Sequence, residues 1–64
     1  MSVVAYARIA RQELKETLES VESAMLSGGI KDFIEYQHIA GKRQGLLQAL
    51  AILDETSKRF DQQD

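Results

Sequence analysis

Few residues of this chain could do acid–base or metal chemistry, because it has one histidine and no cysteine. His38 follows Glu35 in a Glu-x-x-His pattern, the spacing with which bundle helices hold di-metal centres. Such a centre needs further inward-facing Glu residues, and helical periodicity does not place them beside this single motif. Helical spacing also puts no serine beside His38, the one candidate base. We therefore expect no enzyme, no catalytic or metal-binding residue and no cofactor.

Phosphate binding by basic side chains is a second kind of chemistry to consider. The net charge of −2 argues against strong non-specific attraction to nucleic acid, although a local basic stripe would still bind phosphates. On seam positions, the simpler role for an arginine is to pair with a Glu or to extend its charged end along the apolar surface into water. A nucleic-acid-binding regulator of the four-helix-bundle type is therefore the alternative function. Its contacts would be Arg8, Arg11, Lys15, Lys42 and Arg43.

The size of the chain bounds how it can be stabilised. With 64 residues it forms one domain, below the size at which a single hydrophobic core gives comfortable stability. Without Cys there is no disulfide and no thiolate metal site, so association with another chain is the expected stabiliser. No stretch approaches the roughly 20 apolar residues of a membrane span, and the N-terminus lacks a secretory pattern. We expect a cytoplasmic protein that does not bind membranes.

Two segments on either side of Gly28 and Gly29 carry a helical period. Their apolar residues alternate at three- and four-residue spacing, which forms one seam per helix. We predict a helix over about 2–26 with Ser2 as N-cap, a turn at 27–29, a helix over about 30–60 with Asp32 in its first turn, and a frayed tail at 61–64. The seam residues are Leu14, Leu18, Val21, Met25, Tyr36, Ile39, Leu46, Leu50 and Leu53.

The short Ser-Gly-Gly connection makes the two helices antiparallel neighbours. The predicted fold is therefore an all-α, two-helix hairpin. Aligning the helices about this turn sets Leu18 near Ile39 and Val4 near Leu53. In that register the end of the second helix overhangs the start of the first.

The second helix also carries small residues away from its seam. Gly41, Gly45 and Ala49 follow at four-residue spacing, with Ile34 and Ile52 on the same side. A glycine inside a helix costs about 1 kcal/mol relative to Ala, and small residues at this spacing let another backbone approach closely. We interpret the five residues as a close-packing partner face. The alternative is a kink, or a pair of tolerated glycines.

The order of charges in the first helix favours self-association. Basic residues come first and Glu16, Glu19 and Glu22 come last, the reverse of what the helix dipole prefers. Two copies of this helix packed antiparallel would set the basic half against the acidic half. This predicts a homodimer of hairpins that forms a four-helix bundle. The alternative is that these charges only face solvent.

The second half of the chain contains residues that resemble a sequence pattern of a known group of proteins. Phe33-Ile-Glu-Tyr36, Gly41, Gly45-Leu46, Ala49-Leu50 and Asp54 resemble a pattern in small helical proteins of tailed bacteriophages, over roughly Ser27–Lys58. The resemblance implies a viral protein of the host cytoplasm or the virion, which assembles virions or modulates the host. It carries no catalytic residue across. The layout alone is also similar to that of plasmid-encoded RNA-binding four-helix bundles.

These observations together favour one function over the alternatives. We expect a non-enzymatic protein–protein interaction module that acts through helix packing. Its expected partners are a second copy of itself and another protein.

Overall fold

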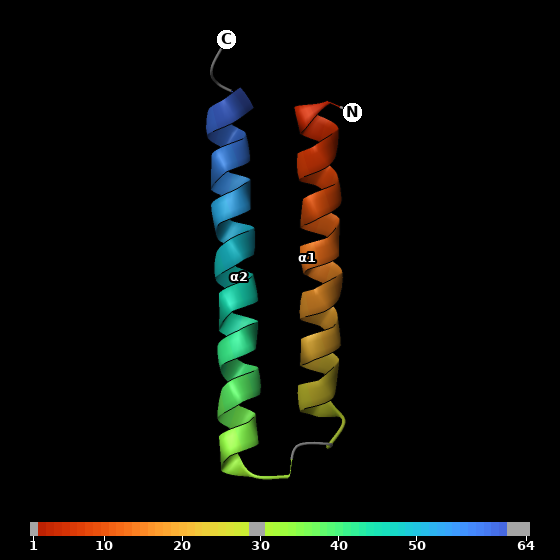
Figure 1. The fold of residues 1–64 in the computed structure, drawn as a ribbon, viewed down its shortest axis with the longest axis vertical. Coiled ribbons are helices and arrows are strands. Elements are labelled where there is room, and N and C mark those ends of the chain that lie inside the picture. Colours follow the sequence, from red (N-terminus) through yellow and green to blue (C-terminus); the bar gives the residue numbers. More distant parts are fainter. Residues whose placement is uncertain (1, 29–30, 62–64) are drawn as a thin grey trace.

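The chain folds into two long antiparallel helices joined at one end (Figure 1). The computed structural model describes residues 2–28 and 31–61, in which α1 spans Val3–Leu26 and α2 spans Phe33–Asp61. No strand occurs in those residues, so the predicted all-α hairpin is confirmed. The molecule measures 50 × 18 × 13 Å along its principal axes, because each helix has only one neighbour to pack against.

The ends of α1 follow from residues that satisfy its free backbone groups. The Ser2 hydroxyl accepts a hydrogen bond from the backbone N–H of Ala5 at 3.1 Å, so the predicted N-cap is confirmed. At the other end, Ser27 is the C-cap and the next residue, Gly28, adopts a φ of +77°. Only glycine takes this left-handed conformation without strain, which is why the helix stops here.

The start of α2 corrects the sequence prediction. The helix begins at Phe33, and Asp32 precedes it instead of lying in its first turn. The Asp32 carboxylate accepts a hydrogen bond from the backbone N–H of Glu35 at 2.7 Å. The Glu35 carboxylate in turn accepts one from the backbone N–H of Lys31 at 3.3 Å. These two bonds resemble a capping box, which fixes the first residue of the helix.

The C-terminal boundary also differs from the expectation. The predicted fraying begins at residue 61, whereas Asp61 belongs to α2. The predictions for residues 29 and 30 and for residues 62–64 lie outside the described residues.

The hairpin encloses a very small core. Within the described residues, Leu18 and Val21 are the only buried apolar side chains, each 8% exposed. The other seam residues are half-buried, namely Leu14, Met25, Ile39, Leu46, Leu50 and Leu53, apart from Tyr36, which is exposed. The seam therefore lies along the contact between the helices, and one neighbouring helix covers it only in part.

Two ion pairs show how the helices lie against each other. Arg11 Nε donates to Asp54 Oδ1 at 2.9 Å, and Arg43 Nε donates to Glu22 Oε2 at 2.8 Å. All four side chains are between a third and a half exposed, so each pair contributes about 0.2–1 kcal/mol. Their main information is therefore geometric, since they join positions far apart in the sequence.

The observed register corrects the predicted one. With Leu18 beside Ile39, Arg11 would lie level with Leu46, whereas it contacts Asp54. The prediction is wrong by about one heptad of seven residues. The connection is longer than the expected three residues because α2 begins at Phe33. At the free ends, the start of α1 and the end of α2 consequently lie nearly level in Figure 1, without the predicted overhang.

Candidate functional site

The hairpin exposes more surface than a compact protein of its mass. Its accessible area is 5272 Å², whereas a folded monomer of 7.2 kDa exposes about 4,100 Å², so the excess is roughly 1,150 Å². Its radius of gyration is 14.9 Å, against about 11 Å for a compact chain of this length. Large exposed apolar side chains account for part of the excess, including Val3, Tyr6, Ile9, Phe33, Ile34, Ile52 and Phe60.

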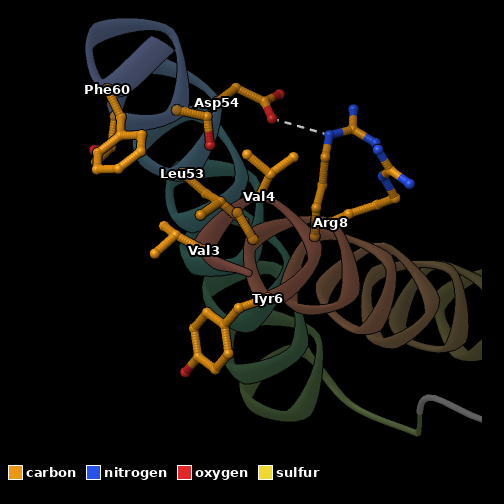
Figure 2. A pocket seen from close by; sticks show the side chains of 11 residues that line it. Val3, Val4, Tyr6, Arg8, Leu53, Asp54 and Phe60 are labelled. Carbon is orange, nitrogen blue, oxygen red and sulfur yellow. Dashed lines mark hydrogen bonds and ion pairs between the residues drawn. The ribbon is translucent and has the colours of Figure 1, made fainter. Parts of the chain in front are cut away.

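The groove between α1 and α2 has two unlike sides. On the ion-pair side, the Arg11–Asp54 and Arg43–Glu22 pairs bridge the helices. Helical periodicity places a different set on the opposite, apolar side, which consists of Val3, Tyr6, Ala10 and Leu14 from α1 and Leu46, Ala49, Leu53 and Phe60 from α2. Figure 2 shows Val3, Tyr6 and Phe60 on one side of the hairpin, with Asp54 and Arg8 on the other.

A cleft of about 400 Å³ opens between the free ends of the two helices (Figure 2). Apolar side chains from both helices line it, among them Val4, Leu53 and Phe60, while Arg8 and the Arg11–Asp54 pair stand at its edge. Of these apolar residues, Val4 is 52% and Phe60 51% exposed. The apolar lining from both helices suits the cleft to burying apolar side chains of another surface.

The residues of the predicted close-packing partner face are exposed in the hairpin, with one exception. Ile34 and Ile52 are 67% and 59% exposed, and Gly41 and Gly45 are exposed as well. A Cβ added to either glycine would meet no heavy atom within 4 Å. Ala49, by contrast, is half-buried and lies at the edge of this face, toward the apolar side. Packing inside the hairpin therefore does not explain the two glycines.

The five basic residues of the nucleic-acid alternative do not form one free stripe. Arg11 and Arg43 are held by Asp54 and Glu22. The remaining three are divided, since helical periodicity places Arg8 and Lys15 on the ion-pair side and Lys42 on the apolar side. The pairing of the two seam arginines with carboxylates agrees with their simpler expected role, although Arg11 pairs with an Asp and not with a Glu.

His38 and Glu35 do not come together with further ligands. Both side chains are exposed, and the Glu35 carboxylate accepts the Lys31 N–H at the start of α2. No group of three or more His, Cys, Asp or Glu side chains in residues 2–28 and 31–61 is arranged to hold a metal ion. In the same part of the chain, neither helix is long and apolar enough to cross a membrane.

Sequence reasoning missed two features that position these surfaces. The Asp-x-x-Glu pattern of Asp32 and Glu35 is a readable signal for a helix start. The ion-pair partners of Arg11 and Arg43 could not be predicted, because they depend on the register of the two helices.

Searches of protein-family models, curated proteins and solved structures found no match for this chain. The likeness to bacteriophage proteins stays a prediction.

Proposed function

We propose that the protein is a non-enzymatic interaction module that packs its two helices against another helical surface. The observation that supports this is the excess accessible area of roughly 1,150 Å² around a core of two buried side chains in the described residues. A protein–protein interface of standard size covers about 800 Å² of each partner. The excess is therefore enough for one such interface.

The physical reason is that helices of this kind depend on packing for stability. Isolated helices are marginal in water, and most of their stability in proteins comes from burial of an apolar face. In this hairpin the mutual contact of α1 and α2 leaves Val3, Tyr6 and Phe60 more than half exposed. A helical surface docked on the apolar side would cover them and would leave the ion pairs on the other side intact.

The nucleic-acid alternative has less support from the same geometry. Two of its five basic residues are already neutralised by carboxylates on the opposite helix. The chain also carries a net charge of −2, which opposes binding to a polyanion.

Unfolding of the dilute chain tests the proposed function. We expect the monomer, at concentrations too low for association, to be only marginally folded by circular dichroism and to unfold over a broad range. A dilute monomer with an ordinary domain stability of about 5–15 kcal/mol would contradict the proposal, because it would need no partner. A gel-retardation assay with generic DNA and RNA at physiological salt tests the alternative, and retardation there would favour nucleic-acid binding.

A further inference from the structure

We propose that a second copy of this chain covers the apolar side, with a two-fold axis parallel to the helices. Each α1 then packs antiparallel against α2 of the second copy, and the free ends of both hairpins lie at the same end of a four-helix bundle. This inference rests on the proposed function and names its partner, its face and its arrangement. It differs from an antiparallel pairing of two α1 helices, which the charge order alone suggested.

The first argument is that both helices carry a second seam beside the one that joins them. In α1 it passes through Val3, Tyr6, Ala10 and Leu14, and in α2 through Leu46, Ala49, Leu53 and Phe60, at spacings of three, four or seven residues. Leu14, Leu46 and Leu53 belong to both seams. A helix with two adjacent seams contacts two neighbours, as each helix of a four-helix bundle does. The hairpin supplies only one of those neighbours.

The second argument is the position of polar residues along this second seam. Toward the free ends it is apolar, with Val3 60% and Phe60 51% exposed. Toward the connection, α2 places Glu35 and Lys42 on the same line, and both are exposed. Copies aligned with free ends together set apolar against apolar residues. The reverse alignment would bring Phe60 toward Glu35, so the first arrangement is favoured.

The third argument is that this arrangement repeats the antiparallel contact already present. Arg11, in the basic first half of α1, pairs with Asp54 of α2. A second α2 on the other side of α1 would run in the same direction and keep the same register.

The fourth argument is the area available. Over the whole hairpin, the accessible area exceeds that of a compact monomer of the same mass by roughly 1,150 Å², against the approximately 800 Å² that each partner contributes to a standard interface. The same comparison of areas applies to each copy, because both copies present the same face in a two-fold contact.

Carboxylates placed on the apolar side test the inference by sedimentation equilibrium of the full chain. Ala10 and Ala49 are half-buried, and Glu keeps a high helix propensity at either position. We expect the unchanged chain to be a dimer. Ala10→Glu or Ala49→Glu should raise the dissociation constant of this dimer by about 100-fold or more, since a buried unpaired charge is costly. Ala51→Glu is the matched control, because Ala51 is exposed elsewhere on α2, and it should leave the dimer intact.

Cross-linking tests the arrangement independently of charge. The chain has no cysteine, so Ala10→Cys chains can be mixed with Ala49→Cys chains and treated with a short thiol cross-linker. We expect a mixed product to form, because α1 of one copy faces α2 of the other. Linkage only between like chains, with no mixed product, would overturn the arrangement.

The remaining outcomes separate this inference from the proposed function. A dimer that survives Ala10→Glu and Ala49→Glu would overturn the proposed face and leave the interaction module standing. A chain that stays monomeric and poorly folded at micromolar concentration would overturn the second copy as partner, while the need for another helical surface would remain. A monomer with the stability of an ordinary domain would overturn both.

Discussion

Gly41 and Gly45 lie inside α2 without any packing reason within the hairpin, and replacing them tests where the partner lies. Within the described residues, Gly28 is the only glycine with a positive φ, so both helical glycines have a backbone that alanine adopts without strain. An added Cβ meets no heavy atom within 4 Å at either position. Each Gly→Ala change should therefore stabilise the helix by about 0.8–1.0 kcal/mol.

The effect on thermal unfolding is large enough to measure easily. For a domain of this size, 1 kcal/mol raises Tm by about 4–8 °C, so the double variant Gly41→Ala/Gly45→Ala should gain about 6–16 °C. The measurement is far-ultraviolet circular dichroism against temperature, at a fixed concentration of protein. Gln44→Ala, at an exposed position between the two glycines, is the control and should change Tm little, since Gln and Ala differ by only a few tenths of a kcal/mol.

A fall in Tm, or loss of the dimer in the double variant, would refute this reasoning. It would mean that another backbone packs directly on the two glycines, as the close-packing partner face predicts. The second copy would then lie on the outer side of α2, and the arrangement inferred from the apolar side would be wrong. A gain in Tm with the dimer retained is the result that the apolar side requires.

Three other changes probe the contacts that hold the hairpin together. Leu18→Ala removes half of the buried pair and should cost about 2–5 kcal/mol, which chemical denaturation of the chain would detect as a lower midpoint. Asp32→Ala removes the acceptor for the Glu35 N–H and should cost about 1 kcal/mol, whereas an unchanged midpoint would mean that the cap is unimportant. Glu22→Gln breaks the bridge to Arg43 and should cost less than about 1 kcal/mol, with the difference shrinking as salt is added.

Much of the local structure could be read from residue types. Ser2 and Gly28 mark the ends of α1 because their side chain and backbone preferences satisfy helix termini without help from distant residues. The start of α2 was misplaced, although the Asp32–Glu35 spacing held the signal. The candidate surfaces could be read only in part, since the exposed fraction of a seam residue depends on what covers it.

The amino-acid sequence by itself determined two helices, their seams and the antiparallel hairpin, because each depends on periodicity and on capping within a few residues. Only the tertiary structure decided the register. Seams that repeat every seven residues face each other equally well after a slip of about one heptad, so apolar patterning does not distinguish the two alignments. The longer connection and the Arg11–Asp54 and Arg43–Glu22 contacts do, and they also separate the ion-pair side of the hairpin from its apolar side.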